Sequence, residues 1–336
     1  MQVKKFAETG REVDQRKVIT YALCGIKLSS NIPFVSHIKK ADDKADVAFT
    51  VVREAPFPVD WQNEVPVYQS PFRNKNDEPV SLLYKVGEYD VMRFPREADF
   101  YIGKDRIIAH IWDSKFLPVL EVQLFGNVIS LWLERQGVLV LHGASTVVDG
   151  RALAFLGNNG QGKSTLTAGM VQLGYSLLGD GILPVECEGD KFLARPRYPE
   201  IRLWPEMAKH FIGHNDLSQV HPEYSKQRIE VGVDSFGRFC NSVQPLGCLY
   251  IPDRRDPLTW GDRVEIEAIP PRNALLELLR YSFLLGLPEA IGLGQERFKF
   301  LSRLAMQVPV RRVTYPVGMD YVSIVCRAIL GDFSRV

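Results

Sequence analysis

The stretch FLGNNGQGKSTL, Phe155–Leu166, decides the fold class of this chain. From Gly157 to Ser164 it reads G-N-N-G-Q-G-K-S and fits the phosphate-loop pattern G-x-x-x-x-G-K-[ST] at every fixed position. The apolar run 152–156 before it predicts a strand, and 163–174 after it predicts a helix that ends at a glycine. A coincidental glycine-rich turn would not need both neighbours. The sequence therefore predicts a strand–loop–helix unit that holds phosphate.

Each residue type in this loop has a physical reason. Glycines let backbone N–H groups point inward and keep Cβ atoms out of the path of the phosphates. The helix N-terminus adds partial positive charge. We expect Lys163 to place its charge on the β- and γ-phosphates and the Ser164 hydroxyl to bind Mg²⁺. The residues expected to hold the nucleotide are Gly157, Asn158, Asn159, Gly160, Gln161, Gly162, Lys163, Ser164 and Thr165.

Length and composition exclude several classes of protein. The 336 residues suffice for roughly two domains of about 150 residues each. Lys and Arg number 41 against 40 Asp and Glu, so no global field draws the chain to nucleic acid or to a membrane. Five cysteines without a CxxC pair speak against a thiolate metal site and favour a reducing compartment. The charged N-terminus lacks a signal-peptide core, so we expect a soluble cytoplasmic protein.

The predicted secondary structure changes near residue 117. Before it, Ala45–Val52 is a clear strand candidate, and short apolar runs over 80–112 predict an antiparallel meander. The proline-containing stretch 51–79 predicts a long loop with little regular structure. From 117 to 137 apolar residues recur at helical spacing. We predict a β-rich N-terminal domain over 1–116, serving substrate recognition or as a scaffold, and an α/β (α+β) catalytic domain over 117–336.

Further elements follow in the second part. Two apolar runs flank Asp149-Gly150 and predict a hairpin, which should place His142 beside the loop. The stretch 175–186 predicts a strand that breaks at the glycines around Asp180. Apolar spacing predicts helices in three later stretches and a strand between the last two. These helices are expected over 270–285, 296–307 and 319–330, and the strand over 308–316.

Two single residues near the loop have open roles. Asp180 could bind Mg²⁺ or orient an attacking hydroxyl, and a turn aspartate that caps its own backbone is equally compatible with its spacing. A lone histidine such as His142 is more often structural than catalytic. A contact between His142 and Asp180 would change that, because each group would tune the other.

Two charged pairs follow. Glu200 and Arg202 lie two residues apart, on one face of an extended segment, where they suit Mg²⁺ and phosphate respectively. A surface charge pair is at least as compatible with that spacing. Lys226 and Arg228 are candidates for stabilising transferred charge, and a solvated loop is the alternative.

The stretch VLHGASTVVDGRALAFLGNNGQGKSTLTAGMVQLGYSLLGDGILPVE, Val140–Glu186, resembles the catalytic core of the HPr kinase/phosphorylase family. The family's H-A-S strand, G-x-G-K-S loop and L-L-x-D-D strand occur in this order and at close to this spacing. YPEIRLWPE, Tyr198–Glu206, is weakly similar to the family's L-E-I-R-G stretch. The front part does not resemble the regulatory domain of true HPr kinases. It is similar to the β-rich lead-in of shorter HPr-kinase-like proteins, among them the lasso-peptide serine kinases.

The resemblance implies a serine-kinase domain related to the phosphoenolpyruvate carboxykinase fold, with a mixed sheet and the phosphate loop in a cleft. Lys163 and Ser164 keep the loop roles, and His142 matches the family's active-site histidine. Asp180 matches the first of two adjacent aspartates, and Glu200 matches a metal-binding glutamate.

Two departures from the family pattern qualify this picture. Gly181 stands where the family has its second aspartate, so either Asp180 acts as the base alone or the base role is weakened. The same departure speaks against phosphorylase activity. The family's R-G-L-G-I run is replaced by R-L-W-P, 202–205, so we do not expect the phosphocarrier HPr as substrate.

The sequence therefore predicts an ATP- and Mg²⁺-dependent kinase that transfers the γ-phosphate in line to a hydroxyl, namely a serine of a peptide or small protein such as a lasso-type precursor. The expected catalytic residues are Asp180, His142 and Lys163; the expected metal ligands are Ser164, Glu200 and Asp180. A nucleotide-binding scaffold or sensor without transfer, and a kinase of a free small molecule such as an amino acid, remain alternatives. We expect neither nucleic acid nor a membrane as partner, and a homo-oligomer stays open.

Overall fold

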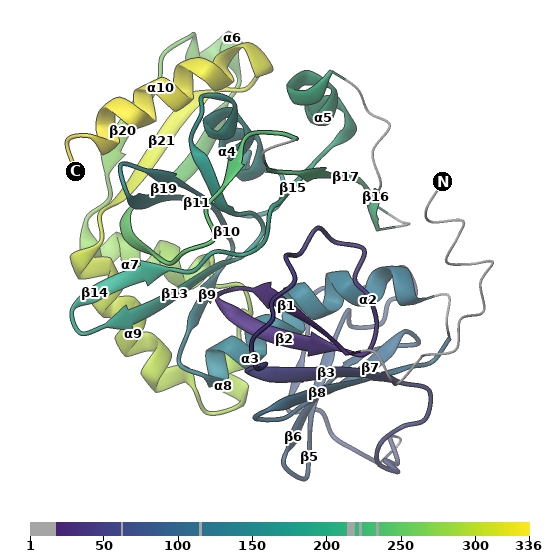
Figure 1. Ribbon diagram of the computed structural model, residues 1–336. Helices are drawn as coiled ribbons and strands as arrows, with labels where there is room; N and C mark the ends of the chain where they lie inside the picture. Colours follow the sequence, from purple (N-terminus) through teal and green to yellow (C-terminus); the bar gives the residue numbers. More distant parts are fainter. Residues whose placement is uncertain (1–17, 62, 114–115, 214–218, 222–223, 233–234) are drawn as a thin grey trace. The chain divides into compact units, whose positions relative to one another are not determined.

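The computed structural model describes residues 18–61, 63–113, 116–213, 219–221, 224–232 and 235–336 (Figure 1). The chain divides into two compact units, Met1–Trp132 and Leu133–Val336. The boundary expected near residue 117 lies earlier than this division, because the helix that begins there belongs to the first unit. The Glu121 carboxylate on that helix accepts hydrogen bonds from the backbone N–H groups of Val35 and Ser36.

None of the described helices combines the length and the apolar composition needed to cross a membrane.

The first unit contains an eight-stranded mixed sheet in the order β1-β2-β3-β8-β7-β6-β5-β4. The predicted meander is confirmed, because β5, β6, β7 and β8 are consecutive antiparallel neighbours. The predicted long loop is also confirmed, since between the end of β3 at Val52 and residue 79 the described residues form one strand, the two-residue β4. The strands are β1 (Ile19–Leu23), β2 (Ile26–Ser30), β3 (Val47–Val52), β4 (Tyr68–Gln69), β5 (Leu82–Val86), β6 (Tyr89–Phe94), β7 (Ala98–Ile102) and β8 (Arg106–Ile111).

A helical segment ends this unit and leads into the next. The predicted helix is present as α2 (Leu117–Gln123), a π-helical turn η2 (Leu124–Val128) and α3 (Ile129–Arg135). Its fully buried Phe125 packs edge-on against Phe34, with ring centroids 4.8 Å apart. The helix stops before a glycine in the left-handed region, as the sequence predicts.

The second unit contains a ten-stranded mixed sheet whose main path is β18-β12-β10-β11-β19-β14-β13-β9, with β21 beside β19 and β20 beside β21. Strands β11, β19 and β21 run parallel. Their carboxyl ends therefore lie at the same edge of the sheet, and β11 leads there into the glycine-rich loop. The strands are β9 (Leu139–Leu141), β10 (Gly143–Val148), β11 (Arg151–Leu156), β12 (Ser176–Gly179), β13 (Leu183–Glu188), β14 (Lys191–Ala194), β18 (Arg238–Phe239), β19 (Gln244–Arg255), β20 (Glu265–Ala268) and β21 (Val310–Pro316).

Helices cover both faces of this sheet. Along β11, Leu153 and Phe155 pack with α4 and α10, whereas Ala152 and Ala154 face the core that α7 and α9 complete. This alternation is the period-2 pattern of a strand buried on both faces. The helices of this unit are α4 (Lys163–Gln172), α5 (Pro205–Ile212), α6 (Pro257–Trp260), α7 (Pro271–Arg280), α8 (Leu287–Ala290), α9 (Gly294–Gln307), the short η3 (Met319–Tyr321) and α10 (Val322–Phe333).

The predicted hairpin, helices and strand of this unit are confirmed, with one correction. The helix expected over 270–285 ends at Arg280. The residues after it leave the helix to bond the backbone of 140–142: Phe283 N–H donates to the Val140 carbonyl and His142 N–H to the Tyr281 carbonyl. Tertiary pairing therefore overrides local helix propensity at this point.

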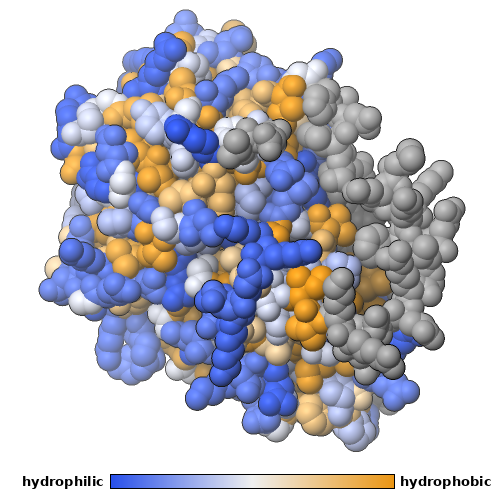
Figure 2. All heavy atoms as spheres, viewed as in Figure 1, coloured by the Kyte–Doolittle hydropathy of each residue, from blue (hydrophilic) through white to orange (hydrophobic). Residues whose placement is uncertain are grey.

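A small three-stranded sheet forms a hydrogen-bonded ladder of its own, separate from that of the large sheet. Its order is β15-β17-β16, with β15 (Glu200–Leu203), β16 (Gln219–His221) and β17 (Tyr224–Glu230). On the face seen in Figure 2, hydrophobic residues lie in groups between hydrophilic ones, an ordinary mixture for a protein surface.

Candidate functional site

The glycine-rich loop joins β11 to α4, as the sequence predicts. Gly160 and Gly162 have φ of +83° and +91°, a region that favours glycine. A Cβ on Gly157 would lie 2.5 Å from Gln161 Oε1, and one on Gly162 would lie 2.8 Å from the Tyr315 hydroxyl. The left-handed backbone therefore favours glycine at 160 and 162, whereas a side chain at 157 would have to displace the end of the Gln161 side chain.

Lys163 lies buried beneath this loop. Its Nζ donates hydrogen bonds to the carbonyl oxygens of Gly157, at 2.7 Å, and Asn158, at 3.0 Å. Burial lowers the pKa of Lys163 to about 8; Asp180 opposes this shift and Lys226 adds to it. Lys163 thus lies close enough to a second ammonium group to be repelled by it, an arrangement that an added anion would stabilise.

Asp180 follows β12 directly and is buried. Its Oδ1 accepts a hydrogen bond from the Ser164 hydroxyl at 2.7 Å, and its Oδ2 accepts one from the backbone N–H of Arg202 at 2.9 Å. Both partners come from other elements, so the alternative of a carboxylate that caps its own turn is wrong. The structure brings together Lys163, Ser164 and Asp180, which the sequence placed in one site.

Arg197 is a residue that the sequence reasoning missed. Its buried guanidinium donates a hydrogen bond to the carbonyl oxygen of Asp180 and lies over the ring of Tyr198, 4.4 Å from the centroid. A Cβ on Gly179 would lie 2.8 Å from the Arg197 Cβ, and one on Gly181 would lie 3.1 Å from its Nη1.

Gly181 also has φ of +95°, in the left-handed region. The glycines around Asp180 therefore fit against the Arg197 side chain. The sequence held one signal of this contact, namely the two glycines that flank Asp180. Glycine in or beside a strand often marks a place where another backbone segment approaches closely.

Glu200, which is buried, and Arg202, which is partly buried, form an ion pair. Arg202 Nε lies 3.1 Å from Glu200 Oε1, and Arg228 Nη1 lies 4.0 Å from Oε2. Burial lowers the pKa of Arg202, but Tyr198 and Glu200 raise it by more, so the guanidinium stays charged. The alternative of a surface charge pair is wrong, since Glu200 is 1% exposed.

Lys226 and Arg228 lie on β17 and not in a solvated loop. Arg228 stands opposite Arg202 in the register of β15 and β17, and it is 5% exposed. Lys226 Nζ lies 5.4 Å from the centroid of the Trp204 ring. Because Lys226 also lowers the pKa of Lys163, this strand adds positive charge to the loop region.

His142 lies between β9 and β10, beside the loop as predicted. Its carbonyl accepts a hydrogen bond from Gly157 N–H at 3.4 Å, and its ring packs edge-on against Phe283, with centroids 5.8 Å apart. Burial lowers the pKa of His142 to about 3, helped by Lys163 and Lys226. The imidazole is neutral at neutral pH.

The expected contact between His142 and Asp180 is not formed. Within the described part of the chain, no hydrogen bond or ion pair joins the two side chains; Asp180 bonds Ser164 and Arg202 instead. The backbone N–H of His142 donates a hydrogen bond to the carbonyl of Tyr281, which holds the residue in place.

The oxygen atoms beside the loop fit Mg²⁺ in part. Ser164 Oγ and Asp180 Oδ1, 2.7 Å apart, are the hard oxygen donors that Mg²⁺ prefers, and Mg²⁺ usually completes its shell with phosphate and water. Among the described residues no three His, Cys, Asp or Glu side chains cluster as a metal cage. Glu200 fits less well, because a direct bond to the ion would require its carboxylate to exchange Arg202.

No family model matches this chain, and no curated protein matches it. Among solved structures the chain is similar to the Hpr(Ser) kinase/phosphatase from Coxiella burnetii. The similarity has a TM-score of 0.31 and 11% sequence identity, and it covers 58% of this chain and 97% of that one. This is a distant structural relation at most.

Proposed function

We propose that this protein is an ATP- and Mg²⁺-dependent kinase that transfers the γ-phosphate to a serine hydroxyl of a peptide or small protein. The observation that carries the proposal is the hydrogen bond between Ser164 and Asp180 beside the buried ammonium of Lys163. A phosphate-binding loop alone is common to many reactions. A buried carboxylate beside the loop's own hydroxyl supplies the pair of oxygens that holds Mg²⁺ in phosphate-loop enzymes, and its second oxygen is a candidate base for an acceptor hydroxyl.

The residues have separate roles in this proposal. Lys163 and the N–H groups of the loop hold the β- and γ-phosphates. Ser164 and Asp180 Oδ1 hold Mg²⁺, which neutralises charge on the phosphates when bound. Asp180 Oδ2, on the side of Arg202, accepts the proton of the acceptor hydroxyl.

The positive groups around Asp180 support the same reaction. Arg202 interacts with Asp180 and Lys226 with Lys163, so both can stabilise charge on the transferred phosphoryl group; Arg228 stands opposite Arg202 on β17. His142 is neutral, and its role in this proposal is to pack near Lys163 and help to hold that side chain in position. Glu200 can bind the metal only if its carboxylate releases Arg202. Otherwise it holds the guanidinium groups of Arg202 and Arg228 in place.

The test is transfer from [γ-³²P]ATP in the presence of Mg²⁺ to three separate acceptors: a degenerate peptide library with serine as its only hydroxyl residue, the same library with threonine, and free L-serine. We expect label in the serine library. Lys163→Ala should abolish it, whereas Lys191→Ala, a matched change at an exposed lysine of β14, should not.

The outcomes separate the alternatives. Label on free L-serine alone would make the protein a small-molecule kinase. Tight ATP binding without label or hydrolysis would make it a nucleotide-binding scaffold. If Lys163→Ala still transferred phosphate, the glycine-rich loop would not be the phosphate-binding element of the reaction.

A further inference from the structure

The carboxyl ends of β19 and β21 extend beyond that of β11. The pairing of β11 with β19 ends at Phe155 opposite Tyr250, whereas β19 continues to Arg255 opposite Pro316 of β21. Residues 251–255 therefore run beside the glycine-rich loop. In open α/β sheets, ligands bind outside the carboxyl ends of the strands.

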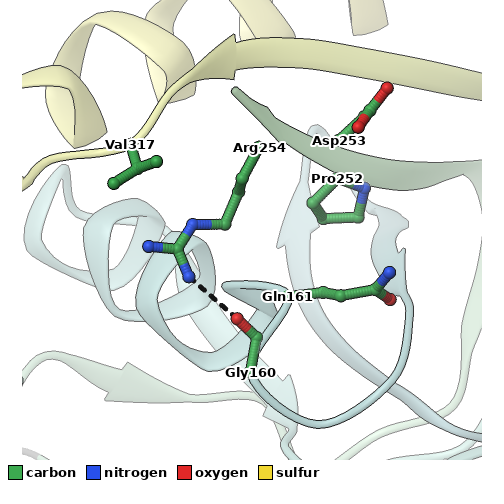
Figure 3. A pocket seen from close by; sticks show the side chains of 6 residues that line it. All are labelled: Gly160, Gln161, Pro252, Asp253, Arg254 and Val317. Carbon is green, nitrogen blue, oxygen red and sulfur yellow. Dashed lines mark hydrogen bonds between the residues drawn. The ribbon is translucent and has the colours of Figure 1, made fainter. Parts of the chain in front are cut away.

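A hollow of about 250 Å³ lies at this place (Figure 3). Arg254 forms one wall and its Nη1 donates a hydrogen bond of 2.8 Å to the carbonyl oxygen of Gly160 in the loop. The residues that line the hollow are Gly160, Gln161, Pro252, Asp253, Arg254 and Val317.

A second hollow of about 290 Å³ shares Gln161, Pro252 and Asp253 with the first. Its other walls are mostly charged, with Glu277 and Arg312 joined by an ion pair of 2.8 Å. The first hollow offers more apolar surface, and Val317 and the planar guanidinium of Arg254 line it and not the second hollow.

The sheet order separates two sides of the loop. Strands β12 and β10 precede β11 in the order, and β19 follows it. Asp180 follows β12, so its carboxylate lies on one side of the loop and the hollow beside β19 lies on the other. A triphosphate along the loop with its terminal phosphate toward Asp180 directs its other end at the hollow.

We propose that the first hollow binds the base of the nucleotide; this rests on the kinase proposal for the phosphate end. A nucleobase is flat and aromatic, and a guanidinium stacks on such a face. Pro252 and Val317 supply apolar contact around it. Small-molecule pockets start at about 300 Å³, so the first hollow takes a base and leaves the phosphates outside, on the loop.

The experiment compares the binding of ATP and of inorganic tripolyphosphate by the full chain, by calorimetry at one Mg²⁺ concentration. The wild-type protein should bind ATP more tightly than tripolyphosphate. Val317→Trp, which fills the hollow, and Arg254→Ala, which removes its planar wall, should each weaken ATP binding by about tenfold, the loss expected for one desolvated stacking contact.

Tripolyphosphate is the internal control. Val317→Trp should leave its affinity unchanged, because Val317 lies outside the loop and the tryptophan fills only the hollow beside it, not the place of the phosphates. Arg303→Gln, at an exposed arginine that bonds the Gly189 carbonyl, should change neither affinity.

The inference is overturned if the wild type binds both ligands equally, if Val317→Trp weakens both alike, or if it weakens neither. It is also overturned if Val317→Trp raises only the KM of the acceptor, since the hollow would then hold the acceptor. ATP binding that depends on the hollow without any phosphoryl transfer would defeat the kinase proposal alone.

Discussion

The Ser164 hydroxyl donates a hydrogen bond of 2.7 Å to Oδ1 of Asp180. This bond joins the first turn of α4 to the end of β12. The second oxygen of the same carboxylate accepts from the backbone N–H of Arg202 on β15. The carboxylate is thereby fixed by α4 and β15, with one oxygen toward the loop and the other toward Arg202. Removing its charge should therefore affect phosphoryl transfer and ATP binding to different extents.

Asp180→Asn should lower the rate of phosphoryl transfer by about 10²–10⁴-fold, the usual contribution of a positioned general base. The side chain keeps its size but loses its charge, so ATP should bind with little loss through the loop. Steady-state kinetics and ATP binding measured on the same preparations check this. Asp190→Asn, at an exposed aspartate after β13, is the matched control. A variant with near-normal rates would show that Asp180 is structural.

Gly181→Ala should destabilise the protein by about 1–2 kcal/mol, because a Cβ is strained at φ of +95° and meets the Arg197 guanidinium. Gly181→Asp should cost less, since aspartate tolerates the left-handed region better and its carboxylate can pair with Arg197. Urea unfolding of both variants tests the order. An alanine variant more stable than the aspartate variant would contradict it.

ATP binding should take up protons near pH 8. The pKa of Lys163 is lowered to about 8, and bound phosphate would raise it, so the protein gains protons where free Lys163 is partly neutral. ATP affinity should therefore fall as pH rises above 8. Calorimetry in buffers of different ionisation enthalpy measures the uptake at pH 8 and should find less of it at pH 6.5. Lys163→Arg, which stays protonated, should bind ATP without it.

His142 should make the protein less stable as pH falls. Its pKa is about 3 in the folded protein and 6.5 in the unfolded chain, so between these values the unfolded chain binds the extra proton. The free energy of unfolding should drop by up to about 1.4 kcal/mol per pH unit below pH 6.5 from this group. His142→Gln should flatten that slope in urea unfolding from pH 7 to 5. An unchanged slope would mean that His142 is solvated.

Local signals account for most of the secondary structure. The G-x-x-x-x-G-K-[ST] spacing, the Asp149-Gly150 turn and the glycine after α4 each depend on neighbouring residues alone, and each is present as predicted. The prediction that the helix runs to 285 is wrong for a nonlocal reason, since the helix ends at Arg280. Backbone groups of 281–283 bond to residues 140–142, and no local pattern encodes that pairing.

The site shows the same division. The motif alone predicts that Lys163 and Ser164 belong to the site. The alternation of side chains along a strand predicts that Glu200 and Arg202 lie on one face. The sequence left Asp180 undecided between a turn and a site, and the structure shows its bonds to two other elements. Arg197 and Arg254 were missed, because each acts on a residue brought near only by folding: the carbonyl of Asp180 and the carbonyl of Gly160.

The sequence by itself therefore determined the loop, its flanking strand and helix, and the residue types that suit phosphate. Only the tertiary structure decided which charges surround that loop, that His142 is neutral and apart from Asp180, and that Gly181 lies against Arg197. The physical reason is range. Turn, strand and helix preferences act over a few residues, whereas burial and ion pairing depend on segments that meet only when the sheet assembles.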